Sequence, residues 1–308
     1  MSIFRKSLAV VSISAVALGA AACNRGESGS SDSVTLALST QTNPFFVELR
    51  DGAQAKADEL GIKLDIQDAS DDASKQADQL KNAETSGAGV VIVNPTDSDA
   101  VGSAVQALNS ANIPVIAVDR SSNSGEVASY VASDNVAGGK QAAEALAKAI
   151  GDEGEILVLQ GIAGSSASRD RGEGFREGIK AHPKIKIVAE QTAKFDRTEG
   201  LNVTTNLLQA HPNVKAIFAE NDEMALGAIE ALGAKAGKDV KVFGFDGTED
   251  GIAAIEKGTM NGTIAQQPEE LGAKAVEQAS ALLKGESAQA EVPVEVVTVD
   301  SSNVAEFK

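Results

Sequence analysis

Short apolar runs alternate with longer amphipathic stretches from Val34 onward. The apolar runs have the length and the β-branched content of strands, and the stretches between them have the spacing of helices with one apolar face. Strands are expected first at 33–39, 63–68 and 89–95, with helices at 44–60 and 72–86 between them. This order predicts a parallel sheet covered by helices on both faces.

The later strand-like runs fall into two series. The first continues at 113–119 and 126–133, and the second occupies 154–161, 184–191, 214–222 and 239–247. Several runs are apolar nearly throughout, as central parallel strands are when helices cover both faces. The fold class is therefore α/β, with two doubly wound parallel sheets in tandem. A length of 308 residues gives each sheet enough chain to bury its own core.

Polar residues follow several of these strands, and open α/β sheets bind ligands beyond the carboxyl ends of their strands. Asp119 and Arg120 follow one buried strand, and Asp246 ends another in the second series. A solvated pair at the rim is the simpler interpretation of such charges, and it would contribute little to stability. Asn43 has a simpler interpretation too, because Asn followed by Pro44 is a usual helix start. The same pattern in both halves of the chain favours a cleft.

Phe45 and Phe46 stand side by side in a chain with nine phenylalanines and no tryptophan. By spacing alone, both rings belong to a first helical turn that packs on the core. Adjacent residues on a helix point about 100° apart, however. One ring is therefore expected to dock on the core, while the other faces the strand ends and suits the apolar face of a sugar ring.

The first 23 residues have the features of an export signal. Arg5 and Lys6 precede an apolar stretch at 8–18, which is too short to remain in a bilayer, and small residues lead to Cys23. Cys23 is the only cysteine and stands where bacterial lipoproteins carry their lipid, although Ala20 replaces the usual leucine of that motif. We expect a signal peptide at 1–22, lipidation at Cys23 and a Gly/Ser-rich tether at 23–33. Ordinary secretion is the alternative.

Net charge limits the partners. The chain has 27 Lys and Arg against 44 Asp and Glu, and removal of the leader's two basic residues leaves 25 − 44 = −19. Such a surface repels nucleic acid and anionic lipid, so nucleic acid is not expected as a partner. Membrane contact is expected through the lipid anchor alone.

No motif for cofactor chemistry fits. Arg169 and Arg171 lie near a predicted helix start in a glycine-rich segment, but its spacing matches neither a dinucleotide-binding loop nor a P-loop. The segment 164–168 lacks the last glycine of a nucleophile elbow. His182 and His211 are isolated before prolines, and one cysteine adds little, so no metal site and no cofactor are expected.

The chain resembles the ribose-binding proteins of bacterial ABC importers from about Val34 to near its C-terminus. The resemblance rests on blocks in family order, among them NPFFVELRDGAQ, NPTDSDAVG, ANIPVIAVDR, RGEGF, FDRTEGLNV, NDEMALGA and GFDGT. In that family, residues of these motifs contact the sugar. The matching positions in this sequence are Asn43, Phe45, Phe46, Asp119, Arg120, Arg171, Phe195, Asn221, Asp246 and Gln266.

The resemblance also implies a periplasmic binding protein type I architecture, with two lobes joined by a three-segment hinge. On this basis we expect an N-terminal lobe at 34–133 plus 267–294 and a C-terminal lobe at 134–266 plus 295–308. The chain would act as a monomer that binds D-ribose and delivers it to the permease subunit in the membrane. It would work outside the cytoplasm, lipid-anchored or periplasmic, without catalysing a reaction.

The chemistry of these residues agrees with a sugar. Two carboxylates, Asp119 and Asp246, balance two guanidinium groups, Arg120 and Arg171, which suits an uncharged ligand. Hydroxyls both donate and accept hydrogen bonds, and aromatic rings pack on the apolar faces of a sugar. Another neutral monosaccharide, such as allose or xylose, is the alternative within this class. A sugar-responsive repressor would need a DNA-binding headpiece before Val34, and an exported sugar enzyme would alter its ligand.

Overall fold

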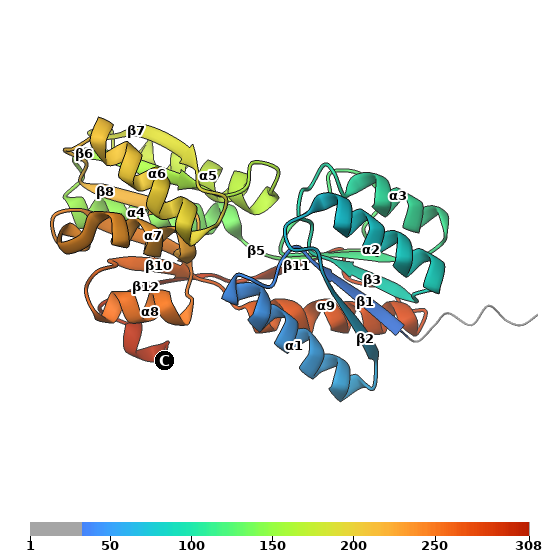
Figure 1. Cartoon of the computed structure of the whole chain (residues 1–308). Helices are drawn as coiled ribbons and strands as arrows, with labels where there is room; N and C mark the ends of the chain where they lie inside the picture. The colour runs from blue at the N-terminus through green and yellow to red at the C-terminus, as the bar shows by residue number, and fades with distance from the viewer. Residues whose placement is uncertain (1–32, 308) are drawn as a thin grey trace, which may run out of the picture.

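The computed structural model describes residues 33–307 (Figure 1). The predicted signal peptide, Cys23 and the predicted tether up to residue 32 lie outside the described residues. Strand β1 begins at Ser33, the last residue assigned to that tether. The chain forms two α/β lobes side by side, each built on one six-stranded sheet.

The N-terminal lobe contains a sheet with the strand order β11-β5-β4-β3-β1-β2, and all its strand pairs are parallel. Its elements are β1 (Ser33–Leu38), α1 (Pro44–Leu60), β2 (Lys63–Asp68), α2 (Ala73–Ser86), β3 (Val90–Val93), α3 (Gly102–Ser110), β4 (Val115–Val118), β5 (Ser129–Ser133), α9 (Pro268–Leu283) and β11 (Glu291–Val294).

The C-terminal lobe contains a sheet with the order β12-β10-β9-β8-β6-β7, in which β12 alone runs antiparallel to its neighbour. Its elements are α4 (Asn135–Ile150), β6 (Gly154–Gln160), α5 (Ser166–Ile179), β7 (Ile185–Thr192), α6 (Arg197–Ala210), β8 (Ala216–Ala219), α7 (Asp222–Leu232), η1 (Gly233–Lys235), β9 (Lys241–Asp246), α8 (Glu249–Glu256), β10 (Gly262–Ala265), β12 (Val297–Asp300) and η2 (Val304–Glu306).

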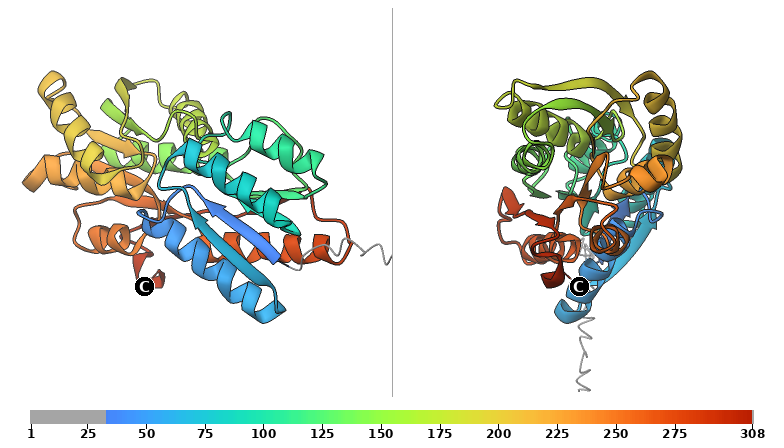
Figure 2. Two further views of the ribbon diagram at one scale, coloured as in Figure 1. Left: turned by 45° about the vertical axis from the view of Figure 1, so that its right-hand side comes forward. Right: turned by 90° about the vertical axis from the view of Figure 1, so that its left-hand side faces the viewer.

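Helices cover both faces of each sheet, as the alternating pattern predicts (Figure 2). In the N-terminal lobe, α1 and α9 pack on one face and α2 and α3 on the other. In the C-terminal lobe, α4 and α5 cover one face and α6, α7 and α8 the other. The central strands β3, β4 and β8 are buried along their whole length, which explains why they read as continuous apolar runs.

The chain passes between the lobes at three places: between β5 and α4, between β10 and α9, and between β11 and β12. Because of these crossings, each sheet receives strands from two separate parts of the sequence. Within residues 33–307 the helices are all too short or too polar to cross a bilayer.

Local signals position the first helix. The Asn43 side chain accepts a hydrogen bond from the Phe45 backbone N–H at 3.0 Å, and Pro44 occupies the first turn. The helix ends at Gly61, whose φ of 68° is a left-handed conformation that glycine adopts without strain. Asn43 thus caps α1, as its sequence context predicts, and the cap fixes where Phe45 and Phe46 begin.

Candidate functional site

The carboxyl ends of both sheets point toward the region between the lobes, and the residues that follow them enclose one pocket. Two of these residues come from α1, three lie directly before α1 or after β4, and the rest belong to the C-terminal lobe. The pocket is lined by Asn43, Phe45, Phe46, Asp119, Arg120, Ala167, Arg171, Phe195, Asn221 and Asp246. All but Ala167 are among the residues singled out from the sequence.

Gln266, the remaining residue predicted for the site, lies directly behind this lining. It follows β10, and its amide donates a hydrogen bond of 2.7 Å to Oδ1 of Asp246. Asn221 has a structural role as well as a place in the pocket, because its side chain caps α7 by accepting from the Met224 N–H at 2.9 Å. It also donates to the backbone carbonyl of Phe195 at 3.2 Å.

Three phenylalanine rings line the pocket. Phe45 and Phe46 meet edge to face, with their centroids 5.1 Å apart and their planes at 86°. Each is only 3% exposed, and both touch the core of the N-terminal lobe as well as the pocket. The structure does not divide the two rings as expected, with one docked on the core and the other facing the strand ends, because each of them contacts the core and also lines the pocket.

Arg120 lies between aromatic rings of the two lobes. Its guanidinium carbon is 5.1 Å from the ring centroid of Phe46 and 5.5 Å from that of Phe195. Its Nη1 donates to the carbonyl of Pro95 at 3.1 Å, and its Nε lies 3.6 Å from Oδ2 of Asp119. The side chain is buried, so the simpler interpretation of a solvated rim pair does not hold.

Arg171 is the corresponding cation in the C-terminal lobe. It projects from α5, where its Nε donates to Asn135 at 2.8 Å and its Nη1 donates to the Glu220 carbonyl at 2.7 Å. The same Nη1 lies 3.4 Å from Oδ1 of Asp246, and the guanidinium carbon is 3.9 Å from the Phe245 ring centroid. These contacts hold the guanidinium in one orientation against the pocket.

Burial and neighbouring cations shift the pKa values of the two buried aspartates in opposite directions. Burial raises the pKa of Asp119, while Arg120 and Arg171 act to lower it. Burial also raises the pKa of Asp246 well above its usual value, against the lowering effect of Arg171. With two buried acids facing two buried cations, the ionised pocket carries no net charge.

Several buried polar atoms of the site have no hydrogen-bond partner in the described part of the chain. They are Oδ1 of Asp119, Nε of Arg120 and Oε1 of Gln266. An unsatisfied buried polar group costs about 1–3 kcal/mol. These atoms provide acceptors and a donor that suit a ligand with several hydroxyl groups.

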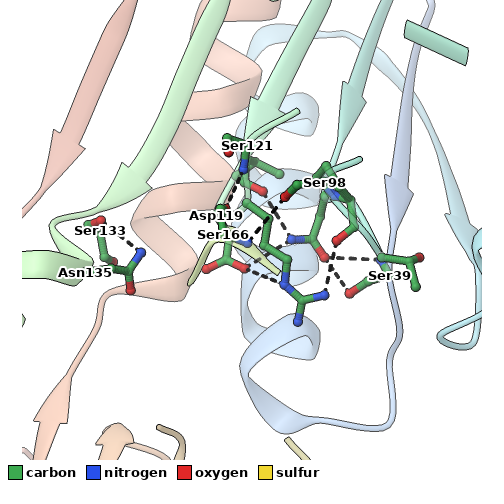
Figure 3. Close-up of polar contacts among 12 residues, drawn as sticks. Ser39, Ser98, Asp119, Ser121, Ser133, Asn135 and Ser166 are labelled. Atoms are coloured by element: carbon green, nitrogen blue, oxygen red, sulfur yellow. Dashed lines mark hydrogen bonds and ion pairs between the residues drawn. The ribbon is translucent and has the colours of Figure 1, made fainter. Parts of the chain in front are cut away.

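The two lobes also touch each other directly beside the pocket (Figure 3). The Ser121 backbone N–H donates to Oγ of Ser166 at 2.9 Å, and the Ser166 N–H donates to Oγ of Ser98 at 3.3 Å. The Ser98 N–H donates to the Gly164 carbonyl at 2.9 Å. These contacts, together with the buried pocket, describe a closed arrangement of the lobes.

Sequence reasoning missed two amides that support the site. Asn94 donates to Oδ2 of Asp119 at 3.1 Å, and Asn135 accepts from Arg171. Asn94 lies in the polar segment after the third strand, so its position at a strand end could have marked it as a residue of the site. Asn135 begins α4, and nothing in its local sequence indicates the contact with α5.

Comparison with known proteins identifies the family. The periplasmic binding protein domain family matches residues 34–287. The chain is 50% identical over 294 residues to the ribose import binding protein of Escherichia coli (strain K12), covering 96% of this chain and 98% of that protein. Among solved structures, the Caulobacter myo-inositol binding protein bound to myo-inositol has a TM-score of 0.85 at 36% identity, covering 92% of this chain and 96% of that one.

A solute-binding protein of an Actinobacillus succinogenes ABC transporter, solved with bound D-allose, has a TM-score of 0.83 at 33% identity. It covers 89% of this chain and 99% of its own. The likeness extends through both lobes, because each relative is covered almost completely. The chain therefore belongs to the periplasmic binding protein family.

Proposed function

We propose that this protein is the extracytoplasmic sugar-binding component of an ABC importer, which binds D-ribose between its lobes and delivers it to a membrane permease. The observation that carries the proposal is the pocket between the two sheets, where aromatic rings and a charge-balanced set of polar groups come together. The 50% identity to a ribose import binding protein over nearly the whole chain supports ribose in particular.

The size of the pocket suits a small ligand. The space between the lining side chains, its open mouth included, is only about 230 Å³. Such a space favours a single sugar ring, whereas a disaccharide would require the lobes to separate. Phe45, Phe46 and Phe195 would pack against the ring, and Asp119, Asp246 and the arginines would bind its hydroxyls.

Charge-assisted hydrogen bonds supply the affinity in this proposal. Each contributes roughly 1.5–3 kcal/mol, so several of them exceed the cost of ordering the ligand and closing the lobes. Specificity comes from the same groups, because a ligand without one hydroxyl would leave a buried partner unpaired. Because a neutral sugar adds no charge, the ionised pocket keeps its net charge of zero when the sugar binds.

Closure follows from contacts on both sides of the pocket. Phe45 and Asp119 belong to the N-terminal lobe, and Arg171 and Asp246 to the other. A ligand that touches both sets stabilises the closed state alone, so ligand binding shifts the population toward closure. We place the lobes at 34–133 plus 267–294 and at 134–266 plus 295–308, with the hinge at the three crossings. The closed form would be what the permease recognises.

Isothermal titration calorimetry tests the ligand. We expect D-ribose to bind most tightly among D-ribose, D-allose, D-xylose and D-arabinose, and Asp119→Ala to abolish measurable binding. If D-allose or D-xylose bound more tightly than D-ribose, that sugar would be the ligand instead. If none of the sugars bound, the proposal of a sugar site would be refuted. NMR of the sugar recovered after incubation should show it unchanged, and a new product would indicate an enzyme.

Anchoring at Cys23 is a separate part of the proposal, and its residues lie outside the described part of the chain. It rests on the leader and the single cysteine. Metabolic labelling with palmitate in a bacterial host should tag the protein, and Cys23→Ser should remove the label and release the protein. An unlabelled wild-type chain that is shed freely would show ordinary secretion.

A further inference from the structure

Asn94 lies at the end of β3, fully buried behind the pocket, and its side chain joins three segments of the N-terminal lobe. Its Nδ2 donates to Oδ2 of Asp119 at 3.1 Å and to the Val118 carbonyl at 3.2 Å. Its Oδ1 accepts from the backbone N–H of Ser39 at 3.2 Å and from the Ser39 hydroxyl at 2.6 Å. Ser39 and Asp119 lie on opposite sides of this network (Figure 3).

The partners of Asn94 determine the orientation of its amide. The Ser39 backbone N–H can only donate, so the atom facing it must be the amide oxygen. The Val118 carbonyl can only accept, so the atom facing it must be the amide nitrogen. Nδ2 is therefore a hydrogen-bond donor to Asp119, and the two oxygens of that carboxylate are no longer equivalent.

Asp119 is held so that one oxygen is left for a ligand. Its Oδ2 is taken by Asn94 and lies 3.6 Å from Nε of Arg120, while Oδ1 has no partner in the described part of the chain. Its backbone has a φ of 62°, a conformation uncommon for residues other than glycine. The Asp119 N–H donates to the Val131 carbonyl at 2.8 Å, which fixes the backbone from behind.

We propose that Asn94 is a positioning residue of the sugar site, which holds Asp119 with Oδ1 directed at a sugar hydroxyl and keeps that carboxylate an acceptor. A donor at Oδ2 stabilises the ionised form, and an ionised carboxylate accepts hydrogen bonds but cannot donate. The site would thus require a donating hydroxyl at this point. This inference rests on the proposed function.

The effect of Asn94 adds to other charges that face Asp119. Arg120 beside it and Arg171 from α5 favour its ionised form, as Asn94 does. Asp246 and Tyr130 also face it, because Asp119 in turn raises the pKa of both. These groups remain in place in variants of Asn94. A change in the pKa of Asp119 in such a variant is therefore due to the Asn94 side chain alone.

Two substitutions of Asn94 separate positioning from packing. Asn94→Leu removes the donor but keeps a side chain that branches at the γ carbon, and we expect a tenfold to hundredfold weaker ribose affinity, which corresponds to the loss of one hydrogen bond to a charged group. Asn94→Asp keeps the shape. At low pH the introduced carboxyl group carries a proton and donates to Asp119, but at higher pH it repels Asp119. The affinity of this variant relative to wild type should therefore fall as the pH rises from 5 to 8.

Asn261→Asp is the matched control. Asn261 also bridges two backbone groups, accepting from the Val242 N–H at 3.0 Å and donating to the Gly237 carbonyl at 3.2 Å. It directly precedes β10 and lies beside the amino end of β9, whereas Asp246 is at the carboxyl end of β9. Its substitution should lower the melting temperature without any pH-dependent change in ribose affinity relative to wild type.

A sugar-free measurement separates this inference from the proposed function. In protein labelled with ¹³C at the aspartate carboxyl carbons, with Asp119→Asn for assignment, Asn94→Leu should raise the pKa of Asp119 relative to wild type. An unchanged pKa, or an affinity ratio for Asn94→Asp that stays flat with pH, would overturn the positioning role. If wild type bound no sugar, the proposed function would fail, and the titration alone would decide what Asn94 does to Asp119.

Discussion

The backbone N–H of Ser121, just after β4, donates to the hydroxyl of Ser166 at the start of α5, with 2.9 Å between nitrogen and oxygen. These residues belong to different lobes, so the bond exists only when the lobes are closed. It lies next to two further bonds of the same kind, from Ser166 to Ser98 and from Ser98 to Gly164. The closed state is therefore stabilised partly by contacts that need no ligand.

Ser166→Ala removes the hydroxyl that accepts from Ser121 and should open the lobes more easily. A hydrogen bond contributes about 0.5–1.5 kcal/mol, so ribose affinity should fall roughly twofold to tenfold, mainly through faster dissociation. Stopped-flow fluorescence measures the rates, and small-angle X-ray scattering of the ligand-free protein should show a larger radius of gyration. Ser287→Ala, at an exposed position, is the control. Equal dissociation rates in both variants would show that the bond does not hold the lobes.

The aromatic rings should matter for binding beyond their role in the core. Phe46→Leu removes part of a flat surface that faces the pocket, so we expect at least tenfold weaker ribose binding in calorimetry. Phe175→Leu makes the same change in the C-terminal lobe, where Phe175 stacks on Phe218 at a centroid distance of 4.2 Å, away from the pocket. Both variants should lose stability, but only the first should lose affinity. If the two variants bound ribose with similar affinity, Phe46 would only fill the core.

Local sequence signals predicted the parts of the fold that depend on neighbours in the chain. The cap at Asn43 and the order of strands and helices are of this kind. The strand expected at 126–133 begins only at Ser129, and β10, β11 and β12 were not predicted at all. β11 contains Pro293, which lacks an N–H and is tolerated because β11 is an edge strand. Four-residue edge strands depend on a sheet formed elsewhere in the sequence.

The site shows the same division. Strand ends and family motifs led to the residues that line the pocket, because parallel strands bring their carboxyl ends to one edge. Phe45 and Phe46 both line a pocket whose other wall belongs to the second lobe, and no local sequence pattern predicts that wall. Asn94 and Asn135 were missed because each supports a charged residue that lies far away in the sequence.

Charge balance in the pocket leads to a third prediction. Asp246→Asn keeps the shape and the contact with Gln266 but leaves Arg171 without its carboxylate. Ribose affinity measured by calorimetry should fall tenfold to hundredfold, as expected for the loss of a charge-assisted bond in a buried site. Asp300→Asn, at the end of edge strand β12, should leave affinity unchanged. An unaltered affinity for Asp246→Asn would show that its charge does not serve the ligand.

Glu220 is a buried acid that adjoins the pocket without lining it. Its carboxylate accepts from the Gly161 N–H at 2.7 Å and from the Ser168 hydroxyl, while its backbone carbonyl accepts from Arg171. Burial raises its pKa to about 7, against the lowering effect of these hydrogen bonds. Between the ordinary value of 4.5 and about 7, the folded protein therefore binds a proton that the unfolded chain has already released.

This difference in proton binding between the folded and unfolded states determines how the stability of the protein depends on pH. Stability falls with rising pH wherever the folded state binds more protons, so Glu220 should destabilise the fold progressively from pH 4.5 to 7 and by a constant amount above that. In Glu220→Gln, which has no charge to bury, the melting temperature should exceed that of wild type by a margin that grows through this window and then levels off. Glu153→Gln, at an exposed position, should show no such growth. A margin that is the same at pH 4.5 and pH 8 would mean that Glu220 titrates as an ordinary glutamate, and scanning calorimetry across this range distinguishes the two outcomes.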